Sequence, residues 1–234
     1  MVTDLYLIRH GGSAANAQPV VSGMRGEAGL TDRGRMQARM LEKRLDAERM
    51  RIDWLYTSTL PRAVETATYI ARALGLPSLG DDGLQELRPG DADGLSYEDW
   101  RTTYPPVGPG PYGHPFHPFA PGGESWATFL ARTGAALTRL VTRHEGQRVA
   151  AITHGGVLEA SFCLAFGLGA TSSRIGIAAT NTSITHWQHH HGTDGRPAWT
   201  LLGFNHAHHL TDQPRHDDPQ SSAGLDTADQ GPLR

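Results

Sequence analysis

The sequence predicts an α/β fold in which helices cover a mostly parallel β-sheet. Strand-like and helix-like patterns alternate along the 234 residues, which are enough for one domain with a substantial core. Two apolar runs, residues 5–9 (LYLIR) and 149–153 (VAAIT), each lead into the tripeptide His-Gly-Gly. Each run is expected to be a short buried strand that stops at a histidine before a glycine turn. Ligands bind beyond the carboxyl ends of parallel strands, so His10 and His154 are expected to share one pocket.

The first half of the chain continues this alternation. Residues 11–30 are rich in Gly, Ala and Ser and are predicted to form a loop, and Thr31 can cap the helix that follows. The apolar stripe of that helix consists of Met36, Met40, Leu41 and Leu45. A short strand is predicted at 54–57.

The next helix is predicted to begin near Pro61, a favourable first-turn residue, and to end at Gly75 and Pro77. Its expected buried face comprises Ala63, Val64, Ala67, Ile70, Ala71 and Leu74. A loop-like stretch follows at 80–95, and a weak helix at 96–103.

Residues 104–123 are rich in Pro and Gly and fit no regular element. Such a long segment is either a lid or specificity loop or a proline-stiffened surface insertion. As a specificity loop it would shape the pocket for the leaving group with its aromatic and histidine side chains, Tyr112, His114, Phe116, His117 and Phe119.

Helix-like and strand-like patterns again alternate in the last part of the chain. Ser125 is predicted to cap a helix that precedes the second His-Gly-Gly strand, and a further helix is predicted at 157–166. Two strands at 184–187 and 199–204 are expected to be joined by a polar loop. Residues 1–210 are therefore expected to form a single catalytic domain, and the polar residues 211–234 a disordered tail.

Composition excludes several classes of function. The net charge of -3 gives no electrostatic case for nucleic acid or an acidic membrane surface, and no apolar run has the length of a membrane span. The single cysteine, Cys163, allows no intrachain disulfide and is expected to be a buried, small apolar residue. With the first strand so close to Met1, no room is left for a signal peptide, and a cytoplasmic location is expected.

The residues near the predicted strand ends favour phosphate chemistry. Arg9 adjoins His10, and Arg62 lies in the first turn of a helix that follows a strand. Two guanidinium groups can bind phosphate oxygens in charge-assisted pairs, and one histidine can attack phosphorus while the other donates to a nonbridging oxygen. Glu86 could protonate the leaving group and then activate water, without a metal. The backbone amides of the glycines after His10, Gly11 and Gly12, are expected to add donors.

These residues resemble the signatures of the histidine phosphatase superfamily, in its phosphoglycerate-mutase-like branch 1. Residues 7–16 (LIRHGGSAAN) resemble Arg-His-Gly-x-Thr/Ser-x-x-Asn, and 29–38 (GLTDRGRMQA) resemble Pro-Leu-Thr-x-x-Gly-x-x-Gln-Ala. Residues 58–67 (STLPRAVETA) resemble the second arginine motif. The remaining matches are Glu86 as the family acid, 122–125 (GGES), 153–156 (THGG) and the closing Asn-x-x-x-His-Leu at 205–210.

The resemblance implies a three-layer α/β sandwich with a central mixed sheet, and hydrolysis without a cofactor or metal. It implies that His10 is the phosphohistidine nucleophile and that Glu86 is the general acid and then the base. Arg9, Arg62 and His154 would form the phosphate pocket. Residues lining the phosphate or the substrate would be Ser13, Asn16, Ser22, Gly23 and Gly155.

Two departures from the family pattern point to an unusual substrate. Gly12 stands where Gln or Glu is common, and Ala92, within 88–94 (RPGDADG), replaces an aromatic residue. A small phosphate ester is the expected partner, and the family allows a homodimer. We expect a phosphomonoesterase, because the longer segment between acid and distal histidine found in mutases is absent. The alternatives are a phosphoglycerate-type mutase and a non-catalytic module that binds a phosphorylated ligand.

The histidine-rich end has two interpretations. Its side chains could bind Zn²⁺ or Ni²⁺ adventitiously, or they could belong to a polar hairpin and a structural closing motif. The second interpretation is favoured because no acidic or cysteine partner shares a regular spacing. The histidines are His186, His189, His190, His191, His206, His208 and His209.

Overall fold

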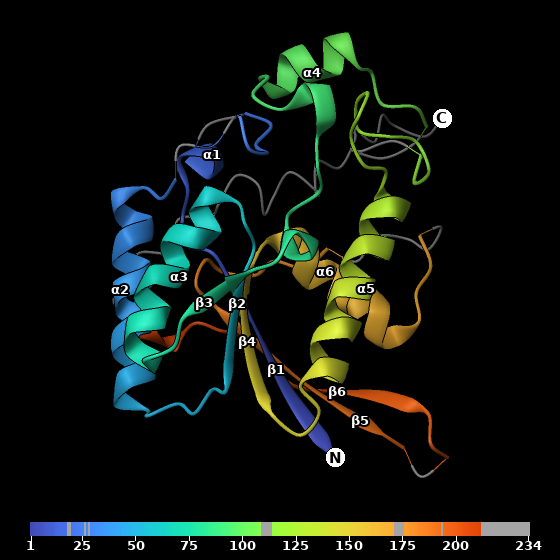
Figure 1. Ribbon diagram of the computed structural model, residues 1–234. Helices are drawn as coiled ribbons and strands as arrows, with labels where there is room; N and C mark the ends of the chain where they lie inside the picture. Colours follow the sequence, from blue (N-terminus) through green and yellow to red (C-terminus); the bar gives the residue numbers. More distant parts are fainter. Residues whose placement is uncertain are drawn as a thin grey trace, which may run out of the picture.

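A six-stranded sheet forms the centre of the computed structural model, which describes residues 1–17, 20–25, 27, 29–108, 114–170, 176–192 and 194–211 (Figure 1). Its strand order is β3-β2-β4-β1-β5-β6. The strands that pair in parallel are β1 with β4, β4 with β2, and β2 with β3, whereas β5 is antiparallel to β1 and to β6. The bounds are β1 Val2–Arg9, β2 Trp54–Thr57, β3 Ser78–Gly80, β4 Arg148–Thr153, β5 Ile184–His191 and β6 Pro197–His206. The predicted mostly parallel mixed sheet is confirmed.

Helices cover both faces of this sheet, which confirms the three-layer sandwich (Figure 1). Helices α2 (Asp32–Ala47) and α3 (Pro61–Leu74) lie on one face, and α5 (Trp126–Arg143) and α6 (Gly155–Phe166) lie on the other. Helix α4 (Tyr97–Thr103) lies beyond the carboxyl ends of the parallel strands. The short helices are α1 Ala14–Ala17, η1 Asp82–Leu84, η2 Gly90–Ala92 and η3 His208–Leu210. No described helix is both long and apolar enough to cross a bilayer.

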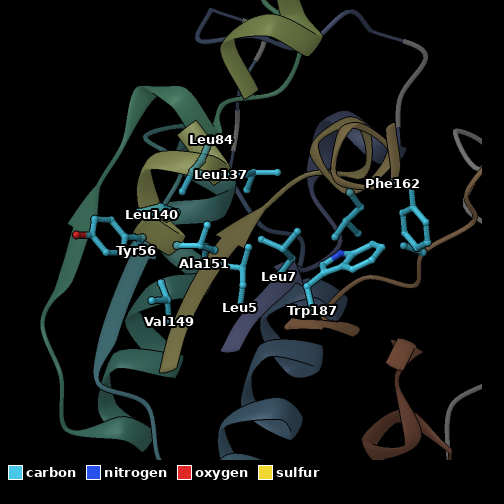
Figure 2. Packing of buried hydrophobic residues seen from close by; sticks show 13 residues of the cluster. Leu5, Leu7, Tyr56, Leu84, Leu137, Leu140, Val149, Ala151, Phe162 and Trp187 are labelled. Atoms are coloured by element: carbon cyan, nitrogen blue, oxygen red, sulfur yellow. The ribbon is translucent and has the colours of Figure 1, made fainter. Parts of the chain in front are cut away.

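Successive side chains of β1 point to opposite faces of the sheet and contribute to two separate hydrophobic clusters. Leu5 and Leu7 pack with Leu137 of α5 and Trp187 of β5, and Figure 2 shows these side chains gathered on one side of the sheet. Ile8 points to the opposite face, where it packs in the cluster formed with α2 and α3. A strand buried on both sides reads as a continuous apolar run, which explains why residues 5–9 showed no polar alternation.

The register of the central pair brings the two histidines to one level. Ile8 is paired with Ile152 and Arg9 with Thr153, so that His10 and His154 follow at the same step. The amide of His10 donates to the carbonyl of Thr153 at 2.9 Å. The expectation that both strands end at one edge is therefore confirmed.

The capping signals act as predicted. The Thr31 side chain accepts from the amide of Gly34, and Ser125 forms a capping box with Thr128. Gly75 ends α3 with a φ of 65°, in the left-handed region that suits glycine.

Several boundaries and faces differ from the prediction. Gly155 and Gly156 belong to the first turn of α6 instead of a glycine turn, and the hairpin strands β5 and β6 run further than 184–187 and 199–204. One helical turn, α1, interrupts the predicted loop. Met36 and Val64, predicted as buried, are exposed. In α2 the inner positions near the first turn are occupied by Gly34 and Gln37, because this turn crosses the loop after β1.

The glycines at that crossing are required by close approach. A Cβ on Gly34 would lie 2.0 Å from the carbonyl oxygen of Gly12, and a Cβ on Gly11 would lie 2.7 Å from the carbonyl oxygen of Gly34. The two segments are thus in backbone contact, which only glycine permits. This contact fixes the loop that follows His10 against α2.

Residues 104–108 and 114–123 contain no helix or strand, as predicted, and Tyr112 lies outside the described residues. Phe119 stacks on Trp100 with ring centroids 4.1 Å apart, and Ala92 lies in the same cluster. The small side chain at position 92 is therefore buried within this cluster. Phe116 is exposed, so a role for this segment in choosing the substrate stays a prediction.

The remaining expectations concern the end of the chain. Cys163 is buried, as predicted. Of the predicted tail, 211–234, all residues after Thr211 lie outside the described residues. In the described part of the chain, no group of three or more His, Cys, Asp or Glu side chains is arranged to hold a metal ion. His186 instead bonds Asp4 at 2.7 Å across the β1–β5 pair.

Candidate active site

Two buried imidazoles lie side by side at the carboxyl edge of the sheet. His10 is 3% exposed and His154 is 1% exposed, and their ring centroids are 5.1 Å apart. His10 follows β1, and His154 is the N-cap of α6. The neighbouring parallel strands β1 and β4 thus bring together two residues that are 144 positions apart in the sequence (154 minus 10).

The tautomer of His10 follows from its partners. Nδ1 lies 2.6 Å from the carbonyl oxygen of Gly11, which can only accept, so Nδ1 carries the proton. Nε2 in turn accepts a hydrogen bond from Nε of Arg62 at 3.2 Å. In the neutral ring, the Nε2 lone pair is the nucleophilic electron pair, and it points toward Arg62.

Burial keeps both imidazoles neutral. Desolvation lowers the pKa of His10 well below its ordinary value of 6.5, and the positive charges of Arg62 and Arg9 lower it further. The pKa of His154 is lowered for the same first reason, with Arg62 and the neighbouring His10 adding to the effect. A neutral His10 can act as a nucleophile without first losing a proton.

His154 has one ring nitrogen engaged and one without a partner among the described residues. Nε2 bonds Oγ of Ser58 at 2.7 Å, whereas the buried Nδ1 has no hydrogen-bond partner. Ser58 Oγ also accepts from the amide of Leu60 at 3.3 Å, so its own proton is available to His154. With Ser58 donating to Nε2, the proton of His154 resides on Nδ1, which is then a donor for a bound anion.

Arg62 joins several groups in the pocket. Besides its bond to His10, its Nη1 contacts Ser22 Oγ at 3.2 Å and forms an ion pair with Glu27. The side chain of Glu27 is 0% exposed and that of Arg62 is 5% exposed, so both charges are removed from water. Glu27 carries no signal in the sequence, because it lies in a segment without a periodic pattern.

A network behind β1 holds the main chain of Arg9 and His10. The Asn181 side chain donates to the carbonyl of His10 at 2.9 Å, and the amide of Thr182 donates to the carbonyl of Arg9. Thr182 has a φ of 62°, which is rare for a β-branched residue. Its hydroxyl bonds His209 at 3.0 Å. The closing motif therefore supports the edge of the site, a role that the sequence alone did not assign.

Arg9 approaches the first turn of α6. A Cβ on Gly155 would lie 3.9 Å from Nε of Arg9, and Nη1 of Arg9 donates to the carbonyl of Ala179. Arg9 thus lies between this turn and the segment that leads into β5. Two guanidinium groups and two neutral imidazoles thus bring hydrogen-bond donors that suit an anion to one place.

Glu86 lies at the amino end of α6, beside His154. Its Oε2 accepts from the amide of Gly156 and its Oε1 from the amide of Leu87, both at 2.9 Å. A helix amino terminus offers unpaired amides to a carboxylate, which is the electrostatic reason for this placement. The site therefore combines the predicted acid with both histidines.

Replacing Gly156 by alanine is expected to displace this carboxylate. The added Cβ would lie 2.2 Å from Oε1 of Glu86, so the carboxylate must leave its position. We expect turnover of an alkyl phosphate to fall by about 10²-fold, the typical contribution of a positioned acid, with the melting temperature largely retained. Gly134→Ala is the matched control, since its Cβ would meet only Leu164 at 3.9 Å. Unchanged turnover in Gly156→Ala would contradict this assignment.

The other predicted lining residues occupy different environments. Ser22 is brought to Arg62, and Ser13 is buried in a bridge with Leu30. Gly23 is tied to Asp93 through its amide at 2.8 Å. The prediction for Asn16 concerns a side chain that lies outside the described part of the structure.

The expectation for the two glycine amides after His10 is wrong. The amide of Gly11 donates to Thr66 Oγ1 at 3.1 Å, and that of Gly12 donates to Gln37 Oε1 at 2.9 Å. Both amides point toward α2 and α3 because the loop packs against these helices. Both amides are therefore already paired within the fold.

Comparison with known proteins gives a consistent result. The family model described as histidine phosphatase superfamily (branch 1) matches residues 5–202. A 2,3-bisphosphoglycerate-dependent phosphoglycerate mutase of Methylobacterium sp. (strain 4-46) is 34% identical over 70% of this chain and 81% of its own. A metal-independent phosphoserine phosphatase of Arabidopsis thaliana is 32% identical over 69% of this chain and 68% of its own. The solved phosphoserine phosphatase of Entamoeba histolytica, in complex with 3-phosphoglyceric acid, is similar with a TM-score of 0.70. It is 26% identical, and the match covers 89% of this chain and 99% of that one.

Proposed function

Because the chain belongs to the histidine phosphatase superfamily, branch 1, we propose that it is a metal-independent phosphomonoesterase. It acts on a small phosphorylated metabolite through a phosphohistidine intermediate on His10. The observation that carries the proposal is the state of His10, whose buried neutral ring presents the Nε2 lone pair beside Arg62.

The phosphate dianion would take its ligands from side chains already in place. Arg62 would turn its donors from His10 to the phosphate oxygens, and Arg9 would supply a second guanidinium group. Nδ1 of His154, buried and without a partner among the described residues, would donate to a nonbridging oxygen. An unpaired buried donor costs about 1–3 kcal/mol, and a phosphate oxygen would remove that cost. Ser13, Asn16, Ser22, Gly23 and Gly155 are proposed to line the phosphate or substrate side.

The first chemical step forms one bond and breaks another. The Nε2 lone pair of His10 attacks phosphorus in line with the ester oxygen, and the phosphorus–oxygen bond breaks. The leaving alkoxide takes its proton from Glu86 in its acid form. Positive charge from Arg9 and Arg62 offsets the charge that develops on the transferring group.

The second step returns the enzyme to its starting state. Glu86, now a carboxylate, takes a proton from water, and the resulting hydroxide attacks phosphorus. The phosphorus–nitrogen bond breaks, its electron pair returns to Nε2, and inorganic phosphate leaves.

The experiment is phosphate release from a panel of small phosphomonoesters with EDTA present, beside the His10→Ala variant. Activity that persists in EDTA and disappears with His10 supports the proposal, and the order of the rates identifies the substrate class. No release from any ester would contradict it and would favour a non-catalytic module that binds a phosphorylated ligand, or a mutase.

A phosphoglycerate-type mutase is the second candidate, because one relative at 34% identity is named as such an enzyme. A mutase must keep its phosphohistidine from water, whereas a phosphatase must admit water. An assay of phosphoglycerate isomerisation separates the two. Isomerisation faster than phosphate release would replace the phosphatase proposal.

The lowered pKa of His10 predicts how the stability of the folded protein depends on pH. The ring is expected to stay neutral in the folded protein as the pH falls through 6.5, whereas it gains a proton in the unfolded chain. The unfolded state then binds more protons, so this group makes stability decrease as the pH falls below 6.5. The nitrogen chemical shifts of His10 in folded and urea-unfolded protein check this. A normal titration in the folded state would contradict the neutral nucleophile.

A further inference from the structure

We propose that Arg132 and Glu124 form a clamp that positions Glu86 as the acid, and that the clamp is needed when the leaving group requires a proton. The inference rests on the proposed function, because it concerns the geometry of the same acid. Neither residue touches the reacting atoms in the proposed mechanism, so both are positioning residues.

Arg132, on α5, binds the main chain of the segment that carries Glu86. Its Nη2 donates to the carbonyl of Glu86 at 3.2 Å. Its Nη1 faces three further carbonyls, those of Gly83 at 2.9 Å, Gln85 at 3.0 Å and Asp82 at 3.3 Å. A planar guanidinium group can hold several acceptors in one fixed arrangement.

Glu124 fixes the other side of this guanidinium group. Its two carboxylate oxygens accept from Nε and Nη2 of Arg132, both at 2.6 Å, in a bidentate pair. The amide of Arg88 also donates to Glu124 at 3.0 Å, and the amide of Glu124 donates back to the carbonyl of Arg88. The clamp therefore holds the chain on both sides of Glu86.

The pair is well shielded, unlike most ion pairs on a surface. The side chain of Arg132 is 15% exposed and that of Glu124 is 13% exposed. Desolvation alone would raise the pKa of Glu124, but the hydrogen bonds from Arg132 and from the amide of Arg88 lower it. The carboxylate is thus kept charged and paired in a site where water competes little.

The segment between η1 and η2 has no regular structure of its own to place Glu86. The carboxylate itself accepts from the amide of Gly156, in the first turn of α6, and from the amide of Leu87, in its own segment. Its position therefore depends on where the main chain of 85–87 lies relative to α6. Arg132 belongs to α5, which packs beside α6. The clamp therefore fixes the main chain of Glu86 relative to the helix layer that also carries His154.

The test compares two substrates whose leaving groups differ in their need for a proton. An alkyl phosphate expels an alkoxide that requires an acid, whereas 4-nitrophenyl phosphate expels a stable phenolate. For Arg132→Met we expect kcat/KM to fall by about 10²-fold on the alkyl ester and by less than about 3-fold on the aryl ester. Glu86→Gln is the benchmark, with the same selectivity and a larger loss. The dissociation constant of vanadate is expected to stay within about 2-fold in Arg132→Met, because phosphate ligands are untouched.

Two further variants keep the test independent of folding. Arg132→Lys retains the charge but cannot reach all carbonyls, and Glu124→Gln removes one charge of the pair. Both are expected to show the same preference for the aryl ester in weaker form. Equal losses on both esters in the folded variants, or unchanged rates, would overturn the clamp. If Glu86→Gln itself shows no leaving-group dependence, or His10→Ala remains active, the proposed function fails instead.

Discussion

Replacing His10 by alanine is expected to abolish hydrolysis of every phosphate ester that the protein accepts. Removing a nucleophile typically costs on the order of 10⁴-fold or more in turnover, because the covalent intermediate proposed on His10 can no longer form. The His10 side chain contributes the only Nε2 that Arg62 contacts within the described residues. Phosphate release with saturating ester, at protein concentrations that allow slow rates to be measured, gives the result.

Two controls distinguish chemistry from folding in this variant. The melting temperature of His10→Ala reports whether the buried site still forms. His208→Ala makes the same change at an exposed histidine that bonds Glu48, and it is expected to leave turnover unchanged. A folded His10→Ala protein that keeps about a tenth of the activity would exclude His10 as the nucleophile.

Replacing Arg62 by methionine is expected to remove activity and stability together, for separate reasons. The phosphate loses a charge-assisted ligand, which typically costs about 10²–10³-fold in turnover. The buried carboxylate of Glu27 loses its ionic partner, and an uncompensated buried charge costs about 3–5 kcal/mol in the free energy of unfolding. Urea denaturation and phosphate release measure the two losses independently.

The double variant Arg62→Met/Glu27→Gln separates them. Neutralising Glu27 removes the buried charge, so most of the lost stability is expected to return, while turnover stays low. If the double variant is as unstable as Arg62→Met, the Glu27 contact is not the source of the instability. If Arg62→Met binds vanadate as tightly as the unmodified protein, Arg62 is not a phosphate ligand.

The parts of the fold that were predictable are those encoded locally. The two His-Gly-Gly runs identified β1 and β4, and the caps at Thr31 and Ser125 set the starts of α2 and α5. The prediction that Met36 is buried is wrong because hydrophobicity does not show which face of α2 meets the loop after β1. Close backbone crossing at Gly34 decided that face, and it depends on tertiary structure.

Some residues of the site are likewise identified by local sequence motifs, whereas others are revealed only by the tertiary structure. His10, Arg62, Glu86 and His154 were found because they follow strands or begin helices in recognisable motifs. Ser58 belongs to the second arginine motif, but its contact with His154 arises only because β2 lies beside β4. Contacts made between distant segments, such as those of Asn181 and Arg132, carry no periodic or compositional signal.

In the proposed mechanism, the phosphoryl group passes through Nε2 of His10. The most direct measurement is intact-protein and peptide mass spectrometry of Glu86→Gln mixed rapidly with an aryl phosphate and quenched in base. A variant without its base is expected to accumulate phosphohistidine, stable in alkali and labile in acid, on the peptide that contains His10. Phosphate release by this variant without any trapped phosphoenzyme, or phosphorylation confined to His154, would exclude His10 as the nucleophile.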